Sequence, residues 1–587
     1  TPDYGLGVAV SEVRRIRDQF IDQAYRNENS RLGFYESQYK AIEEIEDQFG
    51  EMQGVTYESY LINLYNSVNE LAKNPTSTVA RSSLIQNATA FIEKSENVYK
   101  GLKDYQTTLN TQVKNMVDSI NKLGDKIYTL NKKISKIEST GIEDANDLRD
   151  ERDAAIDELS KYIDITYYEN DSKEVIISAE GIPFVTMGEL AKMDTRVVEG
   201  TNLVIPTWPG YERDVYDLST EASNVDDTDK GELKGLLIAR GNMVVDYTVV
   251  PEAPSSSDYD MSTADGRAAY QEAYNKYSKA QEYYNTYIEP SAILSAMAGF
   301  DKLVNGIVEK INNILCPEKS EVRNNPYMAA DGTEIQADIY TYNSVSQQVL
   351  FDRYGREVTG TDNGDGTYSF SSGEKLYMSF GGAEVPVDSY TYSMLDMDKT
   401  GYGMDDDKTV GTELFSRKGT DRYIKTTDDS GKTIYIRNNL NETDYESLYK
   451  LGNLQINPEA AQNVGKIPLS TVQGKEDFDR AKELVDAWDE KFASLNPDTY
   501  AKSDFMTFYN NFIGEYATLG KALGNYVSNQ TTMVDGYDNQ RLQSEGVSSD
   551  EELEKMIKYQ QAYNAASRYV NVVSEMLEHL VTSLGNA

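Results

Sequence analysis

The C-terminal segment, residues 549–587, carries an apolar pattern that an isolated helix cannot bury. Ser548 or Ser549 can cap the start of a helix whose first turn holds the acidic residues 550–552. Neither Gly nor Pro interrupts this helix before Gly585, so the sequence predicts a rod of roughly 50 Å. Apolar side chains recur along the rod at alternating spacings of four and three, at Tyr559, Tyr563, Ala566, Val570, Val573, Leu577, Leu580 and Leu584. This spacing is typical of a coiled-coil seam, and it predicts that these residues form an assembly interface with another helix.

Helical periodicity dominates both ends of the chain. Near-heptad spacing from Leu102 to Ile137, with one stutter, predicts a helix that ends near Gly141. The other helices are expected at residues 11–50, 57–73, 78–93, 143–162, 475–493, 503–545 and 549–584. Arg14, Arg15 and Arg17 are placed on a polar face of the first helix. We expect the N-terminal and C-terminal helices to pack together as an antiparallel bundle, with both termini close in space.

The middle of the chain has the alternating pattern of antiparallel strands. Runs rich in β-branched residues lie at 174–185, and the alternation returns at 333–393. Connections at 363–367 and 379–384 are hairpin signals, and residues 422–438 predict one further hairpin. The predicted fold class is therefore α+β and multidomain: an elongated helical bundle formed by both chain ends, with coiled-coil-like long helices and projecting antiparallel β-rich middle domains.

These patterns divide the chain into successive segments. The segments are residues 1–165, the N-terminal part of the bundle; 166–245, β-rich; 246–298, a helical Tyr-rich insertion; 299–315, a helix returning to the core; 316–398, an inserted antiparallel β-domain; 399–450, the β-rich domain continued; 451–548, the C-terminal part of the bundle; and 549–587, the terminal coiled-coil helix. We expect the β-domain at 316–398 to be autonomous, so that its removal leaves the bundle folded.

Composition excludes several classes of function. A formal net charge of −40 disfavours nucleic acid and anionic membranes as partners. No run of 18 apolar residues predicts a membrane span, and no cleavable signal is visible at the N-terminus. Cys316 and His579 are the only residues of their types, so sites of the zinc, Cys-His or Ser-His-Asp kind cannot be assembled. We therefore predict no catalytic residue, no cofactor and no enzyme activity.

One acidic stretch has the spacing of a calcium loop. Asp396, Asp398 and Thr400 take positions 1, 3 and 5 of that pattern, Gly401 takes position 6, and Asp407 takes position 12. Position 12 normally holds a bidentate Glu, and no helix clearly precedes the stretch. These residues are a weak candidate for calcium, and otherwise no metal site is predicted.

Several ordered blocks resemble one family of flagellar axial proteins, that of the first hook-associated protein (FlgK). The blocks are GLGVAVSEVRRIRDQFIDQAYRNENSRLGFYE near the start, ARSSLIQNATAF at 80–91, ANDLRDERDAAIDELSKYIDI at 145–165, GELKGLLIARG at 231–241, GYGMDDDKTVGTELF at 401–415, NLQINPE at 453–459, DNQRLQSEGVSSDEEL at 538–553 and IKYQQAYNAASRYVNVVSEMLEHLV in the terminal rod. In that family the GYGMDDD block is a conventional one with no metal role.

The resemblance implies a structural subunit that joins hook to filament by assembling in a ring through its terminal helices. It implies the hook protein as partner on one side, the second hook–filament junction protein on the other, and a flagellar export chaperone before secretion. It also implies an extracellular, flagellar location, reached by type III export without a cleaved signal peptide. The family begins with a further N-terminal helix that pairs with the C-terminal one, so we expect that this chain, which starts at Thr1, is truncated.

Two other classes of function remain open. Another axial protein, such as the second junction protein or a flagellin, is disfavoured by the blocks at 145–165 and 231–241 and by the length of the chain. A glycan-binding surface adhesin could instead act through the Tyr-rich inserted domains, since aromatic rings suit half-exposed binding faces. An enzyme is disfavoured by the single histidine.

Overall fold

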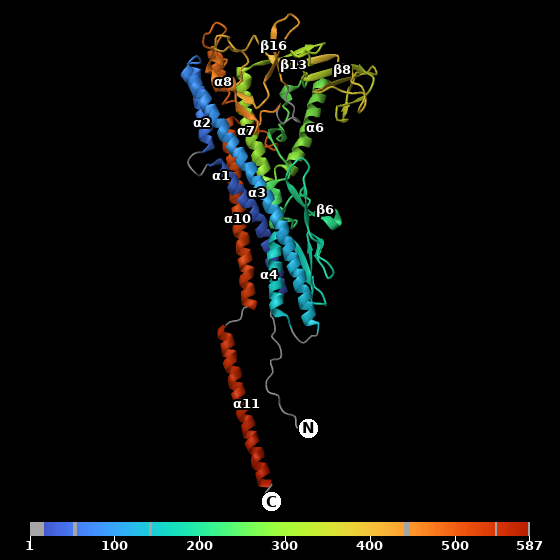
Figure 1. Ribbon diagram of the computed structural model, residues 1–587, viewed down its shortest axis with the longest axis vertical. Coiled ribbons are helices and arrows are strands. Elements are labelled where there is room, and N and C mark those ends of the chain that lie inside the picture. Colours follow the sequence, from blue (N-terminus) through green and yellow to red (C-terminus); the bar gives the residue numbers. More distant parts are fainter. Residues whose placement is uncertain (1–16, 51–55, 140–143, 439–446, 546–548, 585–587) are drawn as a thin grey trace.

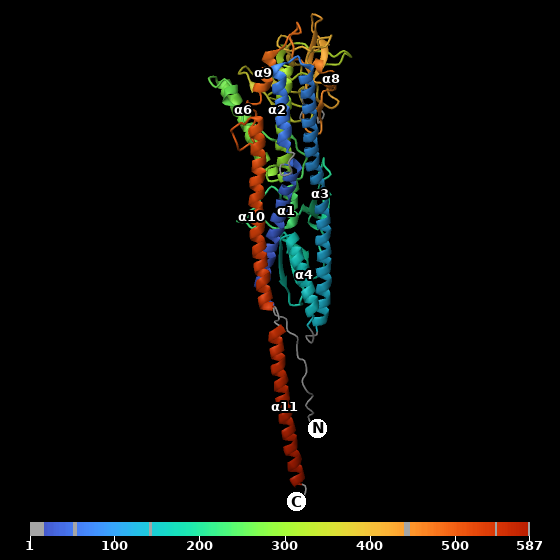
Figure 2. The ribbon, with the colours of Figure 1, turned by 90° about the vertical axis from the view of Figure 1, so that its left-hand side faces the viewer.

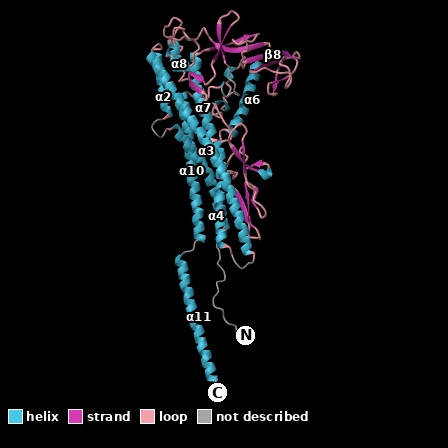
Figure 3. Cartoon of the chain, viewed as in Figure 1, coloured by secondary structure: helices cyan, strands magenta, loops and turns pink. Residues whose placement is uncertain are grey.

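The molecule is elongated, with long helices running along its axis (Figures 1 and 2). The computed structural model describes residues 17–50, 56–139, 144–438, 447–545 and 549–584. A β-rich domain lies at one end, and the C-terminal helix extends beyond the other end, as the secondary-structure colouring of Figure 3 also shows. The structure therefore confirms the predicted multidomain α+β class, with helical chain ends and antiparallel sheets between them.

The helices begin and end largely where the sequence predicts. They are α1 Gln19–Phe49, α2 Tyr57–Lys73, α3 Thr78–Glu138, α4 Asn146–Tyr162, α5 Glu232–Arg240, α6 Ala264–Tyr287, α7 Ala292–Leu315, α8 Pro458–Gln462, α9 Phe478–Asp486, α10 Phe505–Glu545 and α11 Ser549–Leu584. Asp18 starts α1 by accepting the N–H groups of Phe20 and Ile21, and Gly50 ends it with φ of 70°. The predicted start of this helix at 11–16 lies outside the described residues.

Helix α3 corrects the prediction of two separate helices at 78–93 and 102–137. It is a single helix of 61 residues, roughly 90 Å long. Residues 94–101, which the prediction left between the two helices, are helical, and Gly101 among them serves packing. A Cβ atom there would lie 2.0 Å from Oε1 of Gln48, so the absent side chain lets α3 approach α1 closely.

Two small sheets lie along α3 and are bound to it by two asparagines, of which Asn131 is buried and Asn121 is half-buried. The sheets contain β1 Ile165–Glu169, β2 Val175–Ala179 and β3 Ile182–Val185, and β4 Asp194–Val197, β5 Val204–Trp208 and β6 Arg213–Asp214. Asn131 donates to the carbonyl of Val175 at 2.8 Å and accepts its N–H at 3.0 Å. Asn121 binds both backbone groups of Met193 in the same way. Each amide thus satisfies backbone groups that would otherwise be buried without a partner.

The distal β-domain is built on a seven-stranded antiparallel sheet. Its strands, in spatial order, are β11 Thr361–Asp362, β12 Tyr368–Ser372, β8 Ile339–Val345, β13 Ser389–Leu395, β16 Thr433–Arg437 and β15 Tyr423–Thr427, with β7 Glu318–Arg323 also on β13. Two further antiparallel pairs are β9 Val349–Phe351 with β10 Glu357–Thr359, and β14 Phe415–Arg417 with β17 Leu454–Ile456.

This sheet crosses the domain boundary expected at residue 398. Met394 of β13 pairs with Ile436 of β16, so the hairpin predicted at 422–438 is part of the same sheet. Ile434 and Ile436 also lie in the domain core with Tyr342 and Tyr392. Because strand pairing over a long separation leaves no local signal, the sequence located the hairpins but not their pairing.

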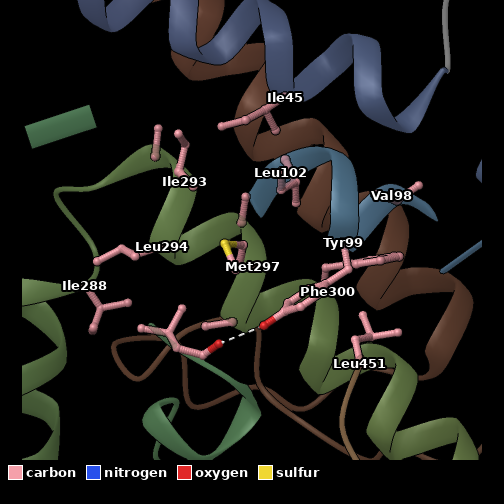
Figure 4. Close-up of a cluster of buried hydrophobic side chains, with 14 of the residues drawn as sticks. Ile45, Val98, Tyr99, Leu102, Ile288, Ile293, Leu294, Met297, Phe300 and Leu451 are labelled. Carbon is pink, nitrogen blue, oxygen red and sulfur yellow. Dashed lines mark hydrogen bonds between the residues drawn. The ribbon is translucent and has the colours of Figure 1, made fainter. Parts of the chain in front are cut away.

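The central core forms where α1, α3 and α7 meet. Figure 4 shows Ile45, Leu102, Met297 and Phe300 in one cluster, in which Tyr99 donates a hydrogen bond to the carbonyl of Val245 at 3.2 Å. Helix α7 is buried along most of its length. This core fixes the long helices relative to one another and connects the β-domain to the base of the bundle.

Candidate assembly interface

The predicted seam of α11 is a solvent-exposed apolar stripe. Tyr559 is 71% exposed, Leu577 is 58% exposed and Leu580 is 54% exposed. Tyr563, Ala566 and Val570 are also exposed, and Val573 is half-buried. Leu584 lies in the last turn of the helix, but its side chain is outside the described set.

The stripe is wider than the seam itself. Exposed apolar residues flank it at Met556, Tyr569, Met576 and Val581. Burying one large aliphatic or aromatic side chain contributes roughly 1.5–3 kcal/mol. A continuous stripe of this kind is typical of a surface that another helix covers, and the assembly interface stays a prediction.

The polar residues of α11 support the helix without covering the stripe. Asp550, Glu551 and Glu552 lie in its first turn, at the positive end of the helix dipole. Lys555 pairs with Glu552 at 2.9 Å, one turn away. His579 is exposed on the same helix.

A buried ion cluster lies at the base of the bundle, where α10 ends and the chain continues toward α11. Arg541 of α10 lies 2.8 Å from Asp22 of α1 and 3.0 Å from Asp157 of α4. Arg26 of α1 approaches Asp157 at 2.6 Å. The Arg26 side chain is 3% exposed, and the Asp22 side chain is 5% exposed. These contacts tie three helices together at the point from which the terminal helix leaves.

We call this group the basal ion cluster. It consists of Arg17, Asp22, Arg26, Asp153, Asp157 and Arg541. Arg17 was expected on a polar face, whereas its guanidinium lies inward against Asp22. Arg541 also stacks over the ring of Tyr25, with its guanidinium carbon 3.8 Å from the ring centre. Arg541 was not predicted as part of a cluster. The one indication in the sequence is an arginine within the helix expected at 503–545.

Asp301 is a second buried ionisable group, in the middle of α7. Its carboxyl accepts the N–H of Leu451 at 2.7 Å and the N–H of Tyr247 at 2.9 Å. Burial raises the pKa of Asp301 to about 7. The group joins α7 to two loops.

The calcium-loop candidate lies at the end of β13. Asp396 accepts the N–H of Asp398 at 3.1 Å and lies 3.8 Å from Nζ of Lys399, while Thr400 bonds within the same turn. Asp398 and Asp407 are exposed. Among the residues that the structure describes, no group of three or more His, Cys, Asp or Glu could hold a metal ion. Calcium binding therefore stays a prediction without an assembled ligand set.

Comparisons with known proteins match both ends of the chain. The family described as the flagellar hook-associated protein FlgK helical domain matches residues 42–249. The family described as the flagellar basal body rod FlgEFG protein C-terminal region matches residues 538–583, which include most of α11. None of the helices in the described part of the chain has the length and apolar character that a membrane span requires.

Individual relatives give the same result. Flagellar hook-associated protein 1 of Bacillus subtilis is 24% identical over 591 residues, which cover 99% of this chain and 87% of that protein. Flagellar hook-associated protein 1 of Salmonella typhimurium is 26% identical over 162 residues, 27% of this chain and 29% of that protein. The solved structure of the flagellar hook junction protein FlgK from Burkholderia pseudomallei aligns with a TM-score of 0.46 at 14% identity, over 90% of this chain and 100% of that one.

Proposed function

We propose that this chain, which belongs to the flagellar hook-associated protein 1 (FlgK) family of hook–filament junction components, assembles in a ring through its terminal helices. The observation that supports this mechanism is the exposed apolar stripe of α11, which lies within the segment matched by the rod-protein C-terminal family. In the assembled ring, helices of neighbouring copies cover this stripe. A head-to-tail contact of this kind repeats around an axis and closes into a ring when its rotation allows.

The proposed partners follow from the position of a junction. The hook protein lies on one side of the ring, and the second hook–filament junction protein lies on the other. Before export, a flagellar chaperone covers the α11 stripe, because an exposed apolar surface of this length favours aggregation. The proposed location is the extracellular flagellum, reached without a cleaved signal peptide.

The proposed role is geometric rather than catalytic. The bundle acts as a rigid spacer whose core joins α1, α3 and α7, and the basal ion cluster holds the end of α10 against α1 and α4. The β-domain lies at the opposite end from α11, so it can face outward without obstructing the seam (Figure 1). The relatives named above support a hook-associated protein rather than a flagellin.

One observation keeps a second role for the β-domain open. Phe380 is 73% exposed and Tyr354 is 54% exposed, and the Phe380 ring lies against Gly355 in the neighbouring turn. Exposed aromatic rings beside arginines, here Arg353 and Arg356, are compatible with glycan binding. Carbohydrate-array binding by the whole chain that is lost in Tyr354→Ala would favour the adhesin alternative.

The assembly mechanism is tested by placing charge on the seam. Leu577→Asp with Leu580→Asp should abolish incorporation into hook–filament junctions, since a charge on a buried seam costs several kcal/mol, roughly 2–7 for even a neutral polar group. The matched control is Asn564→Asp with Asn571→Asp, which adds the same charge to exposed positions outside the seam. Electron microscopy of junctions should show the control incorporated and the seam variant absent. Both variants should have the same circular dichroism spectrum, which shows that both remain folded. Incorporation of the seam variant would show that α11 does not mediate assembly.

A further inference from the structure

A cleft of about 670 Å³ lies beside the bundle, where the end of α6 and the start of α7 meet α1, α5 and α10. Its floor is apolar and buried, and is formed by Phe34, Leu237, Phe512 and the ring of Tyr284. Leu519 of α10 and Tyr287 of α6 line the same cleft and are 41% and 40% exposed. The cleft therefore offers an apolar floor and an accessible apolar lip, which is the usual form of a binding groove.

The rim of this cleft is acidic. Glu221, Glu289 and Glu515 all line it and are exposed. Partial burial in the cleft and the neighbouring charges of Glu515 and Asp498 raise the pKa of Glu289. Glu515 accepts a hydrogen bond from the side chain of Asn496, and no Lys or Arg of the described residues affects the pKa of Glu289 or Glu515. The described part of the chain thus leaves these two carboxylates without a counter-charge.

Asn285 adds an independent polar feature to the cleft. Its Nδ2 donates to the two carboxylate oxygens of Asp498 at 3.1 and 3.0 Å, which fixes the orientation of the amide. Its Oδ1 is buried and has no hydrogen-bond partner among the described residues. A buried acceptor without a donor costs free energy, so this amide adds strain to the wall of the cleft.

We propose that this cleft docks a segment of a partner protein that carries an apolar side chain next to a Lys or Arg. The apolar side chain covers Leu519 and Tyr287 above the buried floor, and the cation lies at the carboxylate rim. Charge complementarity selects this occupant, because acidic segments are repelled by the rim and nucleic acid by the net charge of −40. A second copy of this chain is disfavoured, since it carries 97 acidic residues against 57 basic ones.

The proposal goes beyond junction assembly, because the cleft lies on the side of the bundle and not on α11. Residues 284–292 form part of the wall of the cleft. They belong to the Tyr-rich segment at 246–298 that was expected to be an insertion. The α6 helix is attached to the rest of the chain by Tyr277, whose hydroxyl donates to the carbonyl of Pro497, and by the buried ring of Tyr284. The cleft is therefore a surface for a partner outside the axial stack.

A labelled amphipathic helix made of Leu and Lys is the probe, and its binding to the full chain is measured by fluorescence anisotropy. Glu289→Gln with Glu515→Gln should raise Kd about tenfold, the equivalent of one charge-assisted contact. Leu519→Ser, at an accessible position, should weaken binding similarly. Glu272→Gln with Glu282→Gln changes the same net charge on exposed residues of α6 outside the cleft lining, and should leave Kd unchanged.

Two further measurements separate other occupants from the proposed one. Equal Kd values for the rim variant and the α6 control would show that only the overall charge attracts the peptide, and would overturn the proposal. Displacement of the peptide by spermidine at matching concentrations would assign the cleft to free amines instead. Concentration-dependent dimerisation in light scattering that the rim variant abolishes would assign it to a second copy. Failure of Leu519→Ser to weaken binding would remove the apolar contact from the account.

Discussion

Replacing Arg541 with Ala tests whether the basal ion cluster holds the end of α10 to α1 and α4. The guanidinium lies 2.8 Å from Asp22 and 3.0 Å from Asp157, and its side chain is 9% exposed. Breaking a buried ion pair by removing one partner costs roughly 3–5 kcal/mol, because the remaining charge is left uncompensated. Arg17 still faces Asp22 after the change, and Arg26 still faces Asp157. We therefore expect the lower end of that range, about 3 kcal/mol.

The assay is native-state hydrogen exchange at the C-terminal turns of α10, which reports the free energy of local opening. The matched control is Arg196→Ala. Arg196 binds Asp214 through two hydrogen bonds, at 2.8 and 2.6 Å, but its side chain is 52% exposed. Exposed pairs contribute roughly 0.2–1 kcal/mol, so this control should change stability little. If Arg541→Ala lowers the free energy of local opening by no more than Arg196→Ala lowers the free energy of global unfolding, the cluster does not hold α10 against α1 and α4.

Three further predictions concern the interior. The pKa of Asp301 is raised to about 7 from 3.8, so between these pH values the folded chain holds a proton that the unfolded chain releases. The free energy of unfolding should therefore fall as pH rises from about 4 to 7. Urea titrations across this range should show that slope, and Asp301→Asn should flatten it. Asn131→Ala should cost roughly 1–3 kcal/mol in the same urea assay, because both backbone groups of Val175 lose their partner; an unchanged midpoint would contradict this. Deleting residues 316–398 should yield an insoluble or unsecreted chain, because β16 loses its partner strand β13 and Ile436 becomes exposed. A soluble, secreted product would support the domain boundary at residue 398 that the sequence predicts.

Local periodicity predicted most of the long helices, but it placed a helix at 475–493 where α9 spans only Phe478–Asp486. The bounds of α2 and α11 agree with the ranges expected at 57–73 and 549–584, because both have an uninterrupted apolar period. The gap expected between residues 93 and 102 was wrong, because the helix continues through it and Gly101 serves close packing with α1. The apolar stripe of α11 was predicted from spacing alone, and most of it is exposed. Its role as an assembly seam stays a prediction.

Contacts between distant segments were not predictable in the same way. The pairing of β13 with β16 and the meeting of Arg541 with Asp22 depend on how the bundle closes, and no local pattern encodes them. The asparagines on α3 illustrate the same limit. Asn121 and Asn131 read as ordinary polar positions on a helix, yet each binds both backbone groups of a residue in a sheet segment. The cleft beside α6 also depends on this closure, because five helices contribute to it.

Hydrogen exchange over residues 559–581 tests the central claim, that α11 is covered only on assembly. In the dilute chain the stripe is exposed, so the helix gains no packing energy and its amides should exchange rapidly. In isolated hook–filament junctions the same amides should exchange slowly, because neighbouring helices bury the stripe. Strong protection in the dilute chain, or equally fast exchange in the assembled junction, would contradict assembly through α11.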